Sequence, residues 1–259
     1  MLEGFTLSQI FFLAILIFFA GVVDALAGGG GLITLPAYLA AGLNPALLLG
    51  TNKLASSIGT LAAAVKYQRG HAIRLGALVL PLSACALGSL LGARLSSLID
   101  PAKFKYILLV VLPGVGWLVY SHHQFGREDN SKELGDALVF RRTMLMSLGF
   151  GGYDGFIGPG TGTFFALALA RWCRYDLLGS TARAKFLNLA TNLAALGFFL
   201  HAGRVHIRLG LTMGAVSVLG NWTGSHLGLK KGADAIRPVV ILVCASLFVK
   251  LLADSLLLK

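Results

Sequence analysis

The sequence predicts an all-α polytopic membrane protein with about ten transmembrane segments, arranged as two inverted repeats of five segments with short broken half-helices at the site. Hydrophobic residues make up 56% of its 259 residues and charged residues only 13%, and the mean hydropathy is +0.78. That composition is typical of polytopic helical membrane proteins. In addition, an aspartate followed four residues later by a run of glycines occurs in each half, at Asp24 and at Asp154.

The first half supplies five of the expected segments. Leu7–Ala27 is long enough to cross a bilayer and carries Asp24 near its end. After a run of four glycines, Leu32–Leu43 has only about 12 residues, too few for an ordinary span, so a half-helix is expected there. The remaining segments of this half are Leu47–Val65, Leu75–Leu95 and Phe104–Tyr120.

The second half repeats this order after a polar stretch. We divide the chain into a first membrane repeat over residues 1–121, a polar linker over 122–142 and a second membrane repeat over 143–259. The second repeat also places a short run after a glycine-rich break. Its expected segments are Thr143–Ile157, Phe164–Trp172, Ala184–Leu200, Leu209–Leu227 and Val239–Leu257.

Charged residues match between the halves: Asp24 aligns with Asp154, and Lys53 aligns with Lys185. If all ten segments cross, the loop charges divide into about thirteen basic residues on one side and six on the other, the asymmetry that the positive-inside rule expects. If the short segments are re-entrant, the division is about ten to nine, without a bias. The repeats are therefore expected to be inverted, with both termini on the non-cytoplasmic side.

The two aspartates are candidates for proton coupling or gating. A carboxylate at membrane depth costs about 2.5–3.5 kcal/mol on insertion scales, so an intramembrane aspartate marks a functional candidate. Asp24 and Asp154 either form structural ion pairs with the lysines or take up protons. Burial raises the pKa of a carboxylate and a nearby lysine lowers it, so the sequence leaves both roles open.

The residues around the breaks favour an anion as the substrate. Half-helices that start after the glycine runs would point free backbone amides and positive dipole ends into a cavity. Lysines add positive charge, and threonines and asparagines add hydrogen-bond donors. Two alternatives stay open: the glycines could serve only close packing, and the lysines could extend to the membrane interface. The predicted substrate-binding residues are Gly28, Gly29, Gly30, Gly31, Thr51, Asn52, Lys53, Gly158, Gly160, Thr161, Gly162, Thr163, Lys185, Asn188 and Asn192.

Three motifs resemble the TauE/SafE-type sulfite exporter family, also called the toluene-sulfonate uptake permease group. The motifs are Asp24-Ala-Leu-Ala-Gly-Gly-Gly-Gly-Leu-Ile-Thr-Leu-Pro36, Gly50-Thr-Asn-Lys53 and Tyr153-Asp-Gly-Phe-Ile-Gly-Pro-Gly-Thr-Gly162. The resemblance covers nearly the whole chain and implies a secondary transporter of sulfur-containing anions in the bacterial inner membrane. The family often has Thr-Lys where this chain has Ala184-Lys185, which leaves the substrate more open than the fold.

We therefore expect a transporter that exports sulfite, an organosulfonate or a related anion by alternating access. Its partners would be a small sulfur-containing anion and the lipid bilayer, with protons as a candidate coupling ion and the oligomeric state left open. An anion channel on the same scaffold is an alternative. An intramembrane aspartyl protease would need a Gly-x-Gly-Asp motif, and Asp24 follows Gly21-Val-Val instead, so no enzyme is expected.

No cofactor, metal site or nucleic-acid partner is expected. The three cysteines lie far apart within apolar runs, without the spacing of metal ligands. The net charge of +11 comes from basic residues that cluster between apolar segments, which fits membrane orientation rather than nucleic-acid binding.

Overall fold

The computed structural model describes residues 5–71, 73–98 and 128–231, and within these ranges it contains helices and no strands. The expected segments Phe104–Tyr120 and Val239–Leu257 lie outside the described residues. In chain order the helices are α1 (Leu7–Ala27), α2 (Gly31–Ala40), α3 (Pro45–Gly70), η1 (Leu75–Leu78), α4 (Val79–Ser96), η3 (Ser131–Leu134), α6 (Asp136–Phe156), α7 (Thr161–Trp172), α8 (Leu177–His201) and α9 (Ile207–Lys231).

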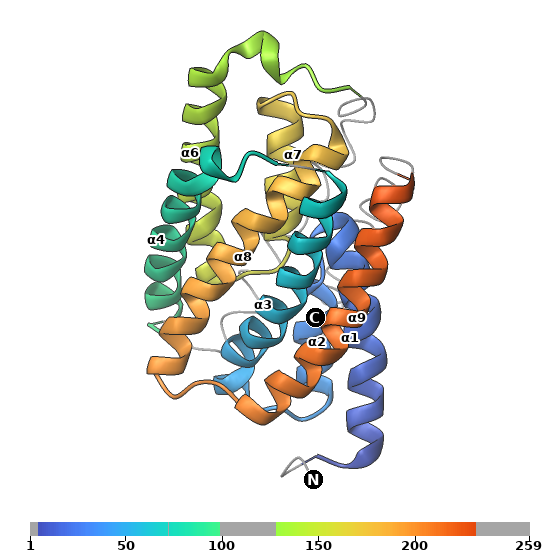
Figure 1. Ribbon diagram of the computed structural model, residues 1–259. Coiled ribbons are helices and arrows are strands. Elements are labelled where there is room, and N and C mark those ends of the chain that lie inside the picture. Colours follow the sequence, from blue (N-terminus) through green and yellow to red (C-terminus); the bar gives the residue numbers. More distant parts are fainter. Residues whose placement is uncertain (1–4, 72, 99–127, 232–259) are drawn as a thin grey trace, which may run out of the picture.

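The helices pack as two groups that each combine both halves of the sequence. Helix α9 packs against α1 and α3, and α4 packs against α6 and α8. Contacts between α3 and α8 join the two groups (Figure 1). In the same view α1 and α3 run upward while α6 and α8 run downward, so matching helices of the two halves point in opposite directions. Each half therefore completes its packing with a helix from the other.

Glycines allow these exchanged helices to approach closely. A Cβ added to Gly92 would meet backbone atoms of α6, and one added to Gly220 would meet backbone atoms of α1. Both residues belong to Gly-x-x-x-Gly pairs, a pattern that lets helix backbones approach one another in membranes. In the first of these pairs, a Cβ added to Gly88 would likewise meet the backbone of Leu148 and Gly152.

The two glycine-rich breaks separate long helices from short ones, as predicted. Helix α1 ends at Gly28, whose φ of +78° lies in the left-handed region and whose N–H donates to Asp24 O over 2.7 Å. Helix α6 ends at Phe156, and Gly158 and Gly160 also have positive φ before α7 begins. The short helices α2 and α7 have 10 and 12 residues. Glycine suits such turns because it adopts positive φ without a Cβ clash.

Two predicted boundaries differ most from the structure. Helix α8 begins at Leu177, seven residues before the expected start at Ala184, because the Asp176 side chain accepts a hydrogen bond from Gly179 N over 3.1 Å and caps the helix. Helix α6 begins at Asp136, inside the expected polar linker. Hydropathy locates the apolar part of a helix, whereas capping and backbone hydrogen bonds determine where the helix starts.

Replacing Asp176 with alanine is expected to lower the free energy of unfolding by about 1 kcal/mol, because the first turn of α8 loses its cap. Asp176→Asn is the matched control, since an asparagine oxygen accepts the same hydrogen bond. Thermal unfolding of the detergent-purified variants measures the difference. Equal losses in both variants would show that the negative charge, rather than the cap, stabilises this end of α8.

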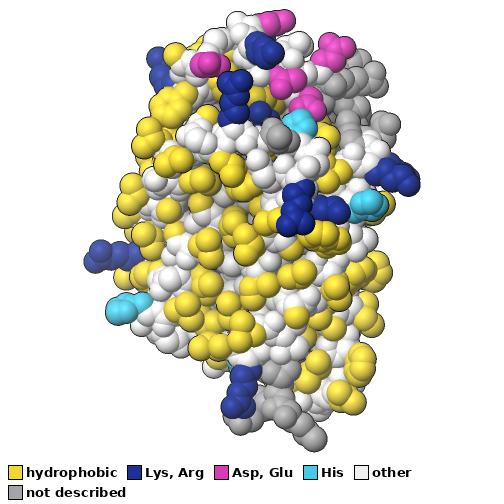
Figure 2. All heavy atoms as spheres, viewed as in Figure 1, with side chains coloured by type: hydrophobic (Ala, Val, Ile, Leu, Met, Phe, Trp, Pro, Cys, Tyr) yellow, Lys and Arg dark blue, Asp and Glu magenta, His cyan; other side chains and the backbone are white. Residues whose placement is uncertain are grey.

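Two described stretches are long and apolar enough to cross a membrane: Leu7–Ala27, with a mean hydropathy of 2.7, and Leu75–Ser96, with 1.9. The other long helices carry polar and charged residues, among them Lys53 in α3, Asp154 in α6 and Lys185 in α8. The visible surface is largely hydrophobic over its middle, and the acidic side chains in view gather at the upper end (Figure 2). Large exposed apolar side chains such as Phe11 and Leu91 fit a surface that faces lipid.

Candidate functional site

The two helix breaks meet in the centre of the protein. A Cβ added to Gly28 would overlap the backbone of Gly162 and Thr163, and one added to Gly162 would lie 2.7 Å from the Cα of Gly28. The Thr163 hydroxyl donates to Ala27 O over 2.5 Å, which joins the second break to the end of α1. The two backbone segments therefore cross so closely that neither Gly28 nor Gly162 has room for a side chain.

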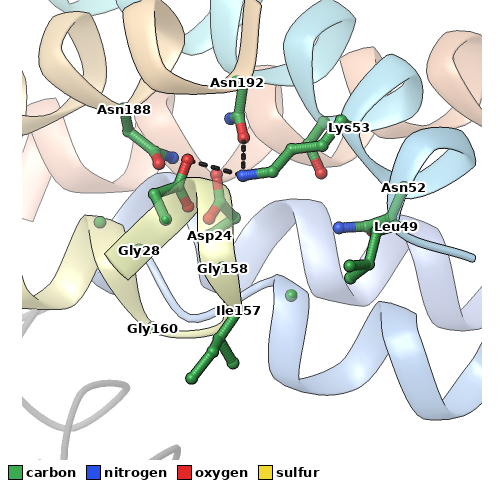
Figure 3. A pocket seen from close by; sticks show the side chains of 14 residues that line it. Asp24, Gly28, Leu49, Asn52, Lys53, Ile157, Gly158, Gly160, Asn188 and Asn192 are labelled. Atoms are coloured by element: carbon green, nitrogen blue, oxygen red, sulfur yellow. Dashed lines mark hydrogen bonds and ion pairs between the residues drawn. The ribbon is translucent and has the colours of Figure 1, made fainter. Parts of the chain in front are cut away.

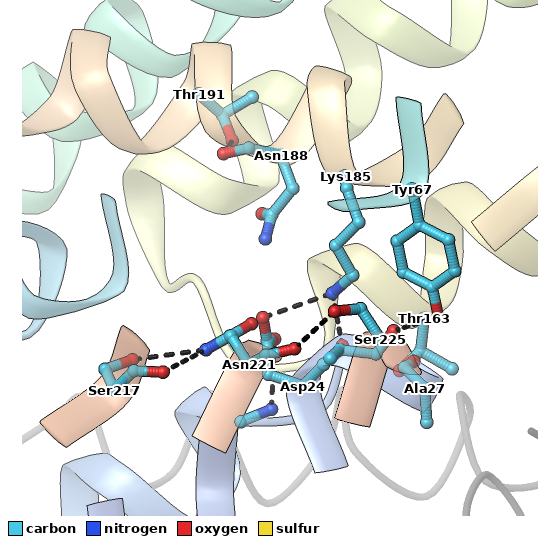
Figure 4. Close-up of polar contacts among 12 residues, drawn as sticks. Asp24, Ala27, Tyr67, Thr163, Lys185, Asn188, Thr191, Ser217, Asn221 and Ser225 are labelled. Carbon is cyan, nitrogen blue, oxygen red and sulfur yellow. Dashed lines mark hydrogen bonds and ion pairs between the residues drawn. The ribbon is translucent and has the colours of Figure 1, made fainter. Parts of the chain in front are cut away.

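The last backbone carbonyls of α1 accept hydrogen bonds from side chains of other helices (Figure 4). The Tyr67 hydroxyl donates to Ala25 O over 3.0 Å, and Thr163 donates to Ala27 O. A helix that ends inside the protein leaves carbonyls without intrahelical donors, and side chains must satisfy them. These contacts fix the broken end of α1 next to the site.

A small cavity of about 30 Å³ lies beside the crossing (Figure 3). By the usual volume criterion it has room for one or two water molecules. Residues from both breaks and from α3 and α8 line it: Asp24, Gly28, Gly31, Leu49, Asn52, Lys53, Ser56, Asp154, Ile157, Gly158, Gly160, Gly162, Asn188 and Asn192. Both halves of the sequence therefore contribute to one site.

Lys53 links the two halves inside this cavity. Its side chain is only 5% exposed, and its Nζ lies 2.6 Å from Asp154 Oδ2 and 2.9 Å from Asn192 Oδ1. Both interactions are drawn as dashed lines in Figure 3. A lysine of the first half thus pairs with a carboxylate of the second.

Lys185 makes the reciprocal pair. Its Nζ lies 3.1 Å from Asp24 Oδ2 and also donates to the Asp24 backbone carbonyl (Figure 4). The other carboxylate oxygen, Asp24 Oδ1, accepts a hydrogen bond from Gly30 N over 3.3 Å. Lys185 is 1% exposed. Because both lysines are buried in ion pairs, neither extends to the membrane interface, and the alternative that they do is wrong.

Three asparagines present amide groups to the cavity. Asn52 Oδ1 accepts from Thr34 Oγ1 over 2.5 Å, so its NH₂ group is left for the cavity. In Figure 3 that nitrogen points toward Lys53 and Asp24. Asn192 Oδ1 is occupied by Lys53, and within the described part of the chain the Asn188 side chain makes no hydrogen bond. The cavity therefore offers N–H donors beside an ammonium group, which is the chemistry that binds oxyanions.

The structure brings most of the predicted site residues together at this cavity. The predicted residues that do not line it hold the surrounding backbone instead. Thr51 donates to Leu47 O and accepts from His206 N, and Thr161 donates to Gly158 O. The full set that lies outside the lining is Gly29, Gly30, Thr51, Thr161, Thr163 and Lys185.

Three residues of the lining were not predicted as site residues: Leu49, Ser56 and Ile157. Ser56 matches Asn188 in the alignment of the two halves, and that match is a signal that could have identified it. Ile157 lies inside the second glycine-rich motif and Leu49 directly precedes the motif Gly50-Thr-Asn-Lys53, and these positions are the signal that could have identified them.

Comparison with known proteins gives consistent results. The sequence profile of the family described as Sulfite exporter TauE/SafE matches residues 13–251. The chain is 38% identical over 244 residues to the probable membrane transporter protein ORF9 of Sinorhizobium, covering 94% of this chain and 92% of that protein. It is 36% identical over 255 residues to the probable membrane transporter protein YfcA of Escherichia coli K12, covering 98% and 93%. A probable membrane transporter protein of Haemophilus influenzae is 38% identical over 238 residues, with 92% of each chain covered. No solved structure matches the chain significantly.

Proposed function

This chain belongs to the sulfite exporter TauE/SafE family and is a membrane transporter rather than an enzyme, and we propose that it exports sulfite or a small organosulfonate by alternating access. The observation that carries the proposal is the buried ammonium of Lys53 beside asparagine amides in the cavity at the two helix breaks. The relatives' names specify a transporter without a substrate, so the anion is inferred from the family description and from this chemistry.

A sulfur oxyanion suits these donors for a geometric reason. A sulfonate or sulfite presents three oxygens on one sulfur, and each can accept hydrogen bonds from a different direction. Asn52 and Asn188 lie on different helices, and Lys53 carries the positive charge. Charge-assisted hydrogen bonds of this kind are about twice as strong as neutral ones. Amides at the start of α7 add the favourable end of a helix dipole.

The small size of the cavity supports an alternating mechanism. At about 30 Å³ it is close to the size of one or two waters, so loading an anion requires the helices around it to separate. Helix α4 of the first half packs against α6 and α8, and α9 of the second half packs against α1 and α3. These interfaces are places at which such a movement can occur. We extend the proposal to two inverted five-segment repeats in the bacterial inner membrane, with both termini on the non-cytoplasmic side.

Anion counterflow in proteoliposomes tests the proposal. Purified protein is reconstituted with unlabelled anion inside, and uptake of labelled sulfite, 2-hydroxyethanesulfonate, sulfate or acetate is measured. A carrier accelerates uptake when the same anion is present on the trans side, and we expect this for sulfite or the sulfonate. Anion flux that follows the gradient without such acceleration would indicate a channel. The absence of flux for every sulfur anion would refute the proposed substrate class.

Replacing Asn188 with alanine is expected to raise the KM for the transported anion about tenfold or more, because one hydrogen bond to a charged group is lost. Stability should change little, since within the described residues the Asn188 side chain has no hydrogen bond to lose. The control is Thr212→Ala, at an exposed residue of α9 whose hydroxyl donates to Arg208 O within the same helix. An unchanged KM for Asn188→Ala would remove this residue from the anion site.

A further inference from the structure

The carboxylates of Asp24 and Asp154 differ in the number of hydrogen bonds that they accept. Asp24 uses both oxygens: Oδ2 accepts from Lys185 and Oδ1 accepts from Gly30 N. Asp154 uses only Oδ2, which accepts from Lys53. Within the described residues no hydrogen bond reaches Asp154 Oδ1, although the residue is buried and lines the cavity. One carboxylate is held by donors outside the proposed anion contacts, whereas the other depends on the lysine that the anion needs.

We propose that Asp154, and not Asp24, carries the proton that accompanies each transported anion. This inference rests on the proposed function. When the anion binds, Lys53 turns its N–H donors from Asp154 to the oxygens of the anion. Asp154 would then be a buried carboxylate beside a second negative charge, which is strongly unfavourable. Uptake of one proton on Asp154 removes that repulsion, and the proton leaves when the anion leaves and the ion pair with Lys53 re-forms.

Among the described residues, Lys53 is the one positive neighbour of Asp154 that is not paired with another carboxylate. From α4 the facing titratable group is Cys85, and on α6 itself it is Tyr153. Helix α8 contributes the neutral amide of Asn192 and the ammonium of Lys185, which is paired with Asp24. The ionisable side chain of α7, Arg171, lies at its opposite end. When the Lys53 ammonium turns away, the Asp154 carboxylate therefore loses the positive charge that stabilises its ionised form.

Asp24 keeps both of its donors through the proposed cycle. Lys185 and Gly30 N donate to it from positions that do not depend on Lys53. Lys185 also donates to the Asp24 backbone carbonyl, which ties this pair to the end of α1. The two ion pairs, although matched in sequence, thus have different tasks: one binds the anion and the proton, and the other holds the broken helix in place.

Proton uptake on binding tests this assignment. Calorimetric titration of the detergent-purified full chain with 2-hydroxyethanesulfonate, in buffers of different ionisation enthalpy, gives the number of protons taken up per anion. A sulfonate is the anion of a strong acid and keeps its charge near neutral pH, so any proton taken up on binding goes to the protein. We expect about one proton per anion for wild type and none for Asp154→Asn. If Asp24 carried the proton instead, the uptake would survive in Asp154→Asn. Glu133→Gln, which breaks only an exposed ion pair with Arg174, is the control and should match wild type.

Several results would overturn the proposal. Sulfonate binding by wild type without proton uptake excludes it while leaving the proposed transport function intact. Proton uptake that survives in Asp154→Asn assigns the proton elsewhere. If wild type neither binds nor exchanges any sulfur anion, the proposed function itself fails and the assignment fails with it.

Infrared difference spectra of wild type provide a second readout that does not depend on a stable variant. Addition of the sulfonate should produce the C=O band of a newly protonated carboxylic acid. A spectrum without that band contradicts the proposal, whatever the behaviour of Asp154→Asn.

Discussion

Replacing Lys53 with alanine is expected to reduce anion counterflow by about a hundredfold or more and to destabilise the protein by about 3–5 kcal/mol. The side chain supplies the only ammonium that lines the cavity among the described residues. Its removal also leaves Asp154, which is 2% exposed, as a buried charge without a partner. Breaking one side of a buried ion pair costs more than removing both. Counterflow in proteoliposomes and thermal unfolding in detergent measure the two effects.

The double variant Lys53→Ala with Asp154→Asn separates transport from stability. Because it contains no unpaired charge, it should recover most of the lost stability while counterflow stays absent. Lys132→Ala, at an exposed lysine of η3, is the matched control and should resemble wild type in both measurements. A folded Lys53→Ala protein with near-normal counterflow would show that the cavity at Lys53 is not the anion site.

Replacing Gly28 with alanine is expected to have the largest structural effect of any single added methyl group in the site. Its φ of +78° costs an alanine about 1–2 kcal/mol, and the new Cβ would overlap the backbone of Gly162 and Thr163. Backbone cannot move aside as a flexible side chain can, so a further 1–3 kcal/mol is expected from overpacking, or about 2–5 kcal/mol in total. Thermal unfolding in detergent measures the loss, and counterflow should fall with it because the two breaks no longer meet.

Gly197→Ala is the control for this substitution. Gly197 lies inside α8 with no heavy atom within 4 Å of an added Cβ. Alanine there should be neutral or stabilising by up to about 1 kcal/mol, since it is the better helix former. If Gly28→Ala is as stable as Gly197→Ala, the close crossing of the two breaks is not a requirement of the fold.

Much of the site could be predicted from sequence because charged residues at membrane depth cost free energy of insertion. Asp24, Asp154, Lys53 and Lys185 stand out within apolar segments, and an intramembrane charge is retained only for a reason. The glycine runs predict the breaks because glycine accepts backbone conformations that other residues avoid. Boundaries such as the start of α8 were missed because a single capping side chain determines them, and hydropathy does not detect a cap.

The sequence by itself determined that this is a helical membrane protein of the transporter family, where its helices break, and which charged residues are candidates for the site. The tertiary structure alone decided the pairing: Lys53 with Asp154 and Lys185 with Asp24, each across the two halves. It also decided that, within the part of the chain that the structure describes, one Asp154 oxygen accepts no hydrogen bond whereas both Asp24 oxygens do. The physical reason is that composition and spacing describe a residue only within its own segment. These ion pairs join residues about 100 or more positions apart in the chain, so they depend on how the helices pack.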